Sequence, residues 1–321
     1  MPISSPLAPL TAVVLAAVLA GCAPKGPWKG SIEYTLSTGL RAVNAQPAYD
    51  AGYTGRGVTV ALIDCGIDKK RGELGRNLSP LSTDLNPERT VVLADRHGDE
   101  VAGPLGSRLD GHGLAGVAYN ATVLSVRADF DGGWKGQCGF YPRDIARALD
   151  YAVDKGAKVA VLPFRADQQF GPKFEAALQR AVDAGVAIVI SSGNESSGQP
   201  SWPARYAIDP RYQGSIVVAG GARKDGSLAP WSNRAGGTSG YFIIAPGEDV
   251  VTDCGGQFCR RVSGTSVSAA YVAGGLALIM QARPNIHARD AIELLLRSAR
   301  VVGDPEDAGR GSLDIGAAFA F

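Results

Sequence analysis

Ser266 stands where a nucleophilic serine could act. It follows Gly264 and Thr265 in the stretch VSGTSVSAAYVAG (residues 262–274), and the small residues after it are compatible with a helix. A hydroxyl at the N-terminus of a helix benefits from the helix dipole, which stabilises negative charge that develops beside it. The same stretch also fits a serine that merely caps a buried helix. Taken alone, Ser266 therefore suggests nucleophilic chemistry without establishing it.

A serine is a weak nucleophile unless a base takes its proton, and histidine is the usual base. The chain contains three histidines, His97, His112 and His287, and the first two each precede a glycine and further small residues. An acid is also available, because Asp64 follows the apolar run of residues 58–63. A carboxylate at the end of a buried strand could orient a histidine ring and stabilise its charged form.

Several stretches together resemble the subtilisin-like serine proteases. Residues 262–274 are similar to the family's Gly-Thr-Ser-Met-Ala-x-Pro-x-Val-Ala-Gly signature, and VTVALIDCGID (residues 58–68) is similar to its first signature, a strand that ends in Asp-Ser/Thr-Gly. SSGNE (residues 191–195) resembles the oxyanion loop of the family, and the chain order of Asp, His and Ser also agrees. The resemblance covers nearly everything from Asn44 to Ala318. The wording of SWPARY and WSNR further resembles the protease domains of bacterial autotransporters.

His97, rather than His112, matches the family's histidine motif, His-Gly-Thr-His-Val-Ala-Gly. The sequence HGDEVAG begins at His97 and matches without a gap, with Glu100 where the family has a second histidine. Aligning His112 instead would delete two residues inside a helix, which would rotate the rest of that helix by about 200°. The resemblance therefore assigns the base to His97 and places His112 in the loop that follows.

The resemblance implies hydrolysis of peptide bonds by a catalytic triad. His97 would take the proton of Ser266, and Asp64 would orient His97. The oxyanion would be bound by the backbone N–H of Ser266 and by the side-chain amide of Asn194. The alternative interpretation of Asn194 is a turn residue that follows Gly193.

The expected substrate-binding edge departs from the family pattern. Pro163, Phe164 and Arg165 stand where the family usually has Ser-Leu-Gly, an edge along which the substrate backbone pairs as an added strand. Arg165 in place of glycine would crowd the primary specificity pocket or give it a positive charge. Two other functions therefore stay open on this fold: a catalytically silent protein that grips a partner strand, and an esterase or amidase that uses the triad on small substrates.

An export signal is predicted at the N-terminus. Residues 10–20 form an apolar run that is too short to span a bilayer, which is typical of a signal peptide. The run ends in Leu-Ala-Gly-Cys, which resembles the lipobox of bacterial lipoproteins; an ordinary signal peptide with a chance cysteine is the alternative. We expect a lipoprotein signal peptide over residues 1–21, a lipid on Cys22 and a tether over residues 22–43. The protein would then be exported and anchored to a membrane of the bacterial cell envelope.

Export would place the four remaining cysteines in an oxidising compartment, where an even number favours disulfides. Cys254 and Cys259 are separated by only four residues and look like a hairpin that is closed by a local bridge. A pairing of Cys65 with Cys138 follows only by elimination, and their redox state stays open.

We expect no required metal or cofactor. No Cys-x-x-Cys pair with a partner histidine cluster points to structural zinc. Residues 103–113 stand where the family has a calcium loop, but Arg108 and His112 would make this loop a poor cage of oxygen ligands. Calcium is therefore not supported by the sequence.

The bulk composition is that of an ordinary globular protein. The chain has 321 residues, a formal net charge of +1 and 45% hydrophobic residues, which gives no reason to expect nucleic-acid binding. We expect a monomer whose partners are protein or peptide substrates.

Strand-like apolar runs alternate with helical patterns after residues 31–53, which look polar and irregular. Strands are expected at residues 58–63, 91–93, 122–127, 159–162, 186–191, 217–219 and 242–244, and helices at residues 142–155, 172–184, 266–283 and 288–299. Continuous apolar runs are typical of strands that are buried on both faces of a parallel sheet. Together with the resemblance, this predicts an α/β protein with the three-layer subtilisin-like fold, in which helices cover both faces of a mostly parallel central sheet. One peptidase domain is expected over residues 44–321.

Overall fold

The computed structural model describes residues 26–68, 73–86, 88–89, 96–131, 138–212, 214–255 and 258–320. The expected signal peptide, Cys22 and the expected strand at residues 91–93 lie outside these described residues.

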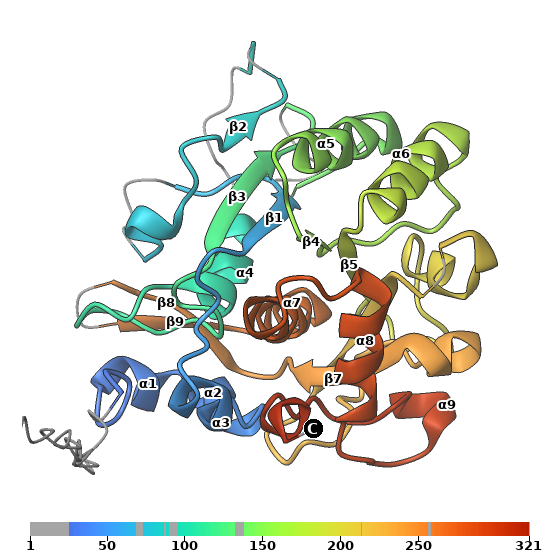
Figure 1. Cartoon of the computed structure of the whole chain (residues 1–321). Helices are drawn as coiled ribbons and strands as arrows, with labels where there is room; N and C mark the ends of the chain where they lie inside the picture. The colour runs from blue at the N-terminus through green and yellow to red at the C-terminus, as the bar shows by residue number, and fades with distance from the viewer. Residues whose placement is uncertain are drawn as a thin grey trace, which may run out of the picture.

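A seven-stranded sheet forms the centre of the molecule, in the order β2-β3-β1-β4-β5-β6-β7, and every neighbouring pair is parallel (Figure 1). The strands are β1 (Thr59–Asp64), β2 (Thr83–Asp84), β3 (Thr122–Arg127), β4 (Val159–Leu162), β5 (Ala187–Ser191), β6 (Ile216–Ala222) and β7 (Phe242–Pro246). The expected strands within the described residues are therefore confirmed: β3 and β4 have the expected ends, and the ends of the others shift by at most three residues. β2 was not expected, because two polar residues carry no apolar signal.

Helices cover both faces of the sheet, which confirms the three-layer α/β fold (Figure 1). On one face lie α4 (His97–Gly106), α7 (Thr265–Ala282) and α8 (Ala288–Arg297), and on the other lie α5 (Pro142–Asp154) and α6 (Pro172–Asp183). Successive strand residues serve opposite cores: Val60 of β1 packs with the α7 side, whereas its neighbour Ala61 packs with the α5 side.

The helix α7 is apolar on all sides because it runs through the core. Among the described residues it is the one helix that is long and apolar enough to cross a membrane, but 83% of its apolar window is buried inside the protein. It is therefore the core helix of this domain.

The N-terminal segment is more ordered than its sequence indicates. Residues 31–53, expected to be irregular, contain the helices α1 (Ile32–Leu36), α2 (Thr38–Ala42) and α3 (Gln46–Asp50). Helices of five residues are too short to show a hydrophobic period, which explains why the pattern was missed. The aromatic residues of this segment, Trp28, Tyr34 and Tyr49, are buried in the same core as α7, so its described part packs onto the domain rather than forming a free tether.

Two further features lie next to the sheet. The antiparallel hairpin of β8 (Val250–Gly255) and β9 (Phe258–Val262) packs beside α4, and a short helix α9 (Pro305–Ala308) follows α8. The expected disulfide between Cys254 and Cys259 is present and joins the two strands of the hairpin. Cys65 and Cys138 are also bonded, with a Cα–Cα distance of 5.8 Å.

Candidate active site

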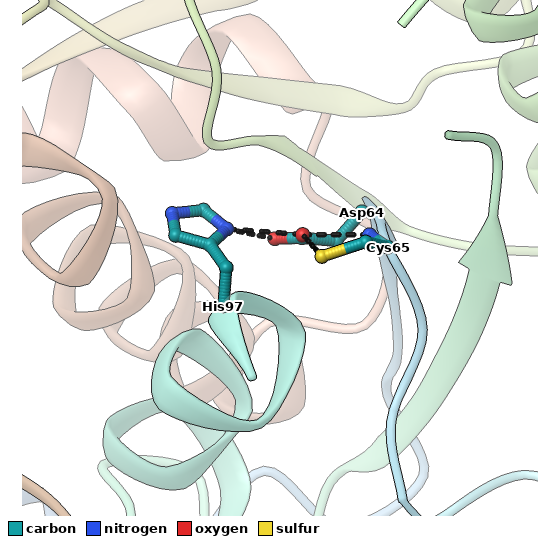
Figure 2. Close-up of side chains that lie close together, drawn as sticks. All are labelled: Asp64, Cys65 and His97. Atoms are coloured by element: carbon teal, nitrogen blue, oxygen red, sulfur yellow. Dashed lines mark hydrogen bonds and ion pairs between the residues drawn. The ribbon is translucent and has the colours of Figure 1, made fainter. Parts of the chain in front are cut away.

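Asp64 and His97 face each other at the carboxyl end of β1. Nδ1 of His97 lies 3.0 Å from Oδ1 and 2.9 Å from Oδ2 of Asp64 (Figure 2). The Asp64 side chain is buried, and its Oδ1 also accepts the backbone N–H of Cys65 at 2.7 Å. Figure 2 shows the second ring nitrogen of His97 on the side away from Asp64. This is the arrangement of a carboxylate that orients an imidazole ring.

Two glycines bring the helix that carries His97 close to its neighbours. A Cβ on Gly98 would lie 2.0 Å from the carbonyl oxygen of Gly66, directly beyond β1. A Cβ on Gly103 would lie 2.0 Å from the carbonyl oxygen of Thr252 in β8. Because no side chain fits at either contact, α4 can approach both β1 and the hairpin, and His97 can reach Asp64.

Ion pairs join the first turn of α4 to the hairpin. Arg96 pairs with Asp253 of β8, and Glu100 pairs with Arg260 of β9. Glu100, which replaces a histidine of the family motif, therefore helps to hold the helix start that carries His97. This role of the hairpin could not be expected from the sequence, because ion pairs between distant segments leave no local pattern.

Ser266 is the second residue of α7. Its Oγ donates a hydrogen bond to the carbonyl oxygen of Pro163, which follows β4, at 2.9 Å. Since β4 is the direct neighbour of β1, both Ser266 and His97 are contacted from the carboxyl ends of adjacent strands. A hydroxyl carries one proton, so Ser266 must turn its O–H bond away from Pro163 before His97 can accept that proton.

Asn194 is held by Thr265, the residue that precedes Ser266. Its Oδ1 accepts from the backbone N–H of Thr265 at 2.9 Å and from the Thr265 hydroxyl at 3.0 Å. Its Nδ2 then has no acceptor among the described residues. A Cβ placed on Gly264 would lie 3.6 Å from this Nδ2 and 3.9 Å from the backbone nitrogen of Ser266. Nδ2 of Asn194 and the backbone nitrogen of Ser266 thus both lie near Gly264, and two such N–H donors could bind one oxyanion.

Comparison with known proteins agrees with this geometry. A profile described as the Subtilase family matches residues 55–314 of the chain. The chain belongs to the subtilase family.

Individual relatives of this subtilase are proteases by name. It is 30% identical over 77% of its length to the alkaline protease of Alkalihalobacillus alcalophilus and to Subtilisin Savinase of Lederbergia lenta, of which it covers 60% and 85% respectively. The major intracellular serine protease of Bacillus subtilis (strain 168) is 26% identical over 76% of the chain and 75% of that protein. A solved protease structure from Pseudoalteromonas arctica has a TM-score of 0.70 at 24% identity, covering 87% of this chain and 93% of the other, and shows the shared fold.

The expected substrate-binding edge of this subtilase lines an open groove of about 1060 Å³. Pro163, Phe164 and Arg165 form part of its wall, together with His97 and Cys138. The groove also has aromatic character: the centroid of the Phe164 ring lies 4.8 Å from that of Phe140 and 6.5 Å from that of Phe170, and all three residues line the groove.

Arg165 does not offer a free positive charge. Its Nη1 lies 2.6 Å from Oδ1 of Asp167, and its Nε lies 2.6 Å from Oε1 of Glu195. Glu195 directly follows Asn194, so these pairs form beside the donors of the oxyanion site.

The residues around Asp64 do not fit a metal ion. Asp64, Cys65 and His97 each bring one potential ligand atom within 4.8 Å of the others. However, Cys65 is in a disulfide with Cys138, so it has no thiolate to donate. Its Sγ instead makes a contact of 3.2 Å with Oδ1 of Asp64, and Nδ1 of His97 is already engaged by the carboxylate (Figure 2).

The loop that contains His112 also does not fit calcium. The His112 side chain is 90% exposed. The backbone N–H groups of Asp110, Gly111 and His112 all donate to Oε1 of Glu33, at 2.7, 2.7 and 3.1 Å. A loop whose N–H groups converge on a carboxylate presents donors, whereas calcium needs oxygen ligands.

Glu73 connects this loop to the hairpin. Its carboxylate accepts from the backbone N–H of Cys254 at 3.0 Å and, more weakly, from that of Leu114 at 3.4 Å. Burial raises the pKa of Glu73 above its usual value, and the two backbone N–H groups only partly offset this effect.

Proposed function

We propose that this subtilase is a serine endopeptidase in which Asp64, His97 and Ser266 act as the catalytic triad and Asn194 acts as the oxyanion donor. The observation that carries the proposal is the pairing of the buried Asp64 carboxylate with Nδ1 of His97. Binding alone would not require this pair in a chain that also places a serine at a helix start and two potential N–H donors near the same glycine.

The geometry supports a hydrolysis in two halves. In the first half, His97 takes the proton of Ser266 as Oγ attacks the scissile carbonyl carbon, and Asp64 stabilises the resulting imidazolium. The carbonyl oxygen becomes negative and is bound by Nδ2 of Asn194 and the backbone N–H of Ser266. His97 then gives its proton to the leaving amine, which departs and leaves an acyl-enzyme ester on Ser266. In the second half, His97 takes a proton from a water molecule, and the water oxygen attacks the ester carbonyl carbon. His97 then returns this proton to Oγ of Ser266, and the carboxylic acid product is released.

Labelling with a fluorophosphonate tests the triad directly. We expect wild type and His112→Ala to react with the probe and to cleave casein, whereas His97→Ala and Ser266→Ala do neither. His112→Ala is the matched control, because this exposed histidine lies in a loop that is held by backbone contacts. The proposal fails if wild type is not labelled, which would favour a silent binding protein, or if His112→Ala abolishes labelling. Labelling with cleavage of esters but not of casein would identify an esterase instead.

We further propose that the protein is exported and carries a lipid on Cys22. Two disulfides in the described residues support export, because such bonds persist in oxidising compartments. In a bacterial expression host, we expect the wild type to fractionate with membranes and to carry acyl chains on its N-terminal cysteine by mass spectrometry. Cys22→Ala should not be acylated there, and an unmodified N-terminus on the wild type would contradict the proposal.

A further inference from the structure

The space beside the nucleophile lies between two segments that extend from adjacent parallel strands. Residues 163–165 follow β4 and residues 193–195 follow β5. The first segment contacts Ser266 through the carbonyl of Pro163, and the second carries Asn194. A substrate whose carbonyl carbon meets Ser266 and whose oxygen meets Asn194 must therefore place the side chain of that same residue between the two segments.

Further hydrogen bonds link these segments to each other and to their surroundings. Oγ of Ser191, at the end of β5, donates to the carbonyl oxygen of Phe164 at 3.4 Å and ties the bases of the segments together. Farther along, Ala166 and Trp202 exchange backbone hydrogen bonds of 2.7 and 3.1 Å. The guanidinium of Arg165 also crosses from the first segment to Glu195 of the second.

The carboxylate of Glu195 is held in place by several hydrogen bonds while it pairs with Arg165. While its Oε1 pairs with Arg165, its Oε2 accepts from the backbone N–H of Asn194 at 3.0 Å, from Nδ2 of Asn233 at 2.9 Å and from Oγ of Ser201 at 3.3 Å. Asn233 is fully buried, so this carboxylate cannot swing aside without losing several partners at once.

Resting on the proposed function, we propose that Arg165 is a specificity-determining residue that bars the space between residues 163–165 and 193–195. The enzyme therefore favours peptides with a small, uncharged residue, such as alanine, glycine or serine, at the carbonyl that Ser266 attacks. A larger side chain must displace Arg165 from both of its carboxylates. An acidic side chain gains little, because Arg165 already faces Asp167 and Glu195 and the three groups together carry one net negative charge.

The expected discrimination is moderate. The side chains of Arg165 and Glu195 are 47% and 37% exposed, and ion pairs with such exposure are worth only a few-fold each in an equilibrium. Displacing both pairs should cost about tenfold in kcat/KM.

The test compares two peptide nitroanilides that differ only in having alanine or phenylalanine before the scissile bond. We expect the wild type to prefer alanine by about tenfold, and Arg165→Ala to raise the Phe/Ala ratio of kcat/KM by about tenfold. Arg165→Met, which keeps the length of the side chain but not its charge, should raise the ratio by a smaller factor. Arg180→Ala is the matched control, because Arg180 also pairs with two carboxylates, Asp150 and Asp154, but lies on α6.

The inference is overturned if the wild type cleaves the phenylalanine substrate as well as the alanine substrate. It is also overturned if Arg165→Ala leaves the ratio within twofold of the wild type, or if Arg180→Ala changes the ratio as much as Arg165→Ala does. These results are separate from a failure of the proposed function, in which the wild type would show neither fluorophosphonate labelling nor peptide cleavage.

Discussion

Glu33 should be a major stabilising residue although it lies far along the chain from the catalytic residues. Its side chain is buried, and its Oε1 accepts the backbone N–H groups of Asp110, Gly111 and His112. Hydrogen bonds to a charged group are worth about 1.5–3 kcal/mol each when buried. These three residues are exposed, so water can replace the lost acceptor, and about 1 kcal/mol per bond is the appropriate value. Glu33→Ala should therefore lower the free energy of unfolding by about 3 kcal/mol.

The variant Glu33→Gln separates the effect of the negative charge from that of the side chain's shape. The glutamine keeps an oxygen at the same position, and neutral hydrogen bonds are about half as strong as charge-assisted ones, so the expected loss is about 1.5 kcal/mol. Urea denaturation monitored by tryptophan fluorescence measures the loss of unfolding free energy for both variants. Both substitutions are made in the Ser266→Ala background so that no self-digestion occurs. Glu293→Ala is the control, because Glu293 makes only exposed ion pairs with Arg297 and Arg310 and should cost less than about 1 kcal/mol.

Three results would refute this reasoning about Glu33. A loss of less than about 0.5 kcal/mol for Glu33→Ala would mean that its hydrogen bonds contribute nothing net. Equal losses for the alanine and glutamine variants would mean that the charge is irrelevant. A smaller loss for Glu33→Ala in the presence of a calcium chelator than in its absence would mean that a cation, rather than Glu33 alone, holds this loop.

Two further predictions concern the packing around the site. Gly98→Ala should lower kcat/KM at least about 100-fold. Its Cβ would lie 2.0 Å from the carbonyl oxygen of Gly66, and a displacement of α4 by about 1 Å would move His97 away from Asp64. A folded variant with normal thermal stability and with activity within threefold of wild type would contradict this prediction. The contribution of Glu73 to the free energy of unfolding should fall as pH rises. Burial raises the pKa of Glu73 in the folded state, so below the ordinary glutamate pKa the protonated carboxyl favours the folded state. This stabilisation is lost as the pH rises through the folded-state pKa. The variant Glu73→Gln lacks this titration. Between about pH 4 and 7, its urea denaturation midpoint should therefore rise relative to that of the wild type as the pH increases. A difference between the two midpoints that does not change with pH would disprove the effect.

The sheet and the larger helices could be predicted because their signals are local. The runs at β1 and β4 are apolar on both faces, and α5 and α6 show clear amphipathic periods, so each element is visible within a short window. The choice of His97 over His112 also depended on a local signal, the ungapped alignment of one helix with the family's histidine motif. In the structure His97 lies next to Asp64, whereas His112 is exposed.

The contacts that could not be predicted all join segments distant in sequence. Glu33 is one glutamate among many until the fold places it against residues 110–112. The pairing of Cys65 with Cys138, which spans 73 positions, could be reached only by elimination and not from any local pattern. Arg165 was expected to crowd or charge the substrate pocket. Its actual state depends on Glu195, whose position only the packing of β5 beside β4 determines.

The packing of the N-terminal helices also limits where the proposed enzyme could work. Trp28 is buried against Tyr34 and Tyr49, so folded structure begins within a few residues of Cys22. Four peptide steps from Cys22 to Gly26 span at most about 14 Å. With a lipid on Cys22, folded structure would begin within about 14 Å of the lipidated residue, and the enzyme would search for substrates in two dimensions. Figure 1 shows the arrows of β1 and β3 pointing away from α1–α3, so the groove at their carboxyl ends would open away from the membrane, toward proteins that stand above it.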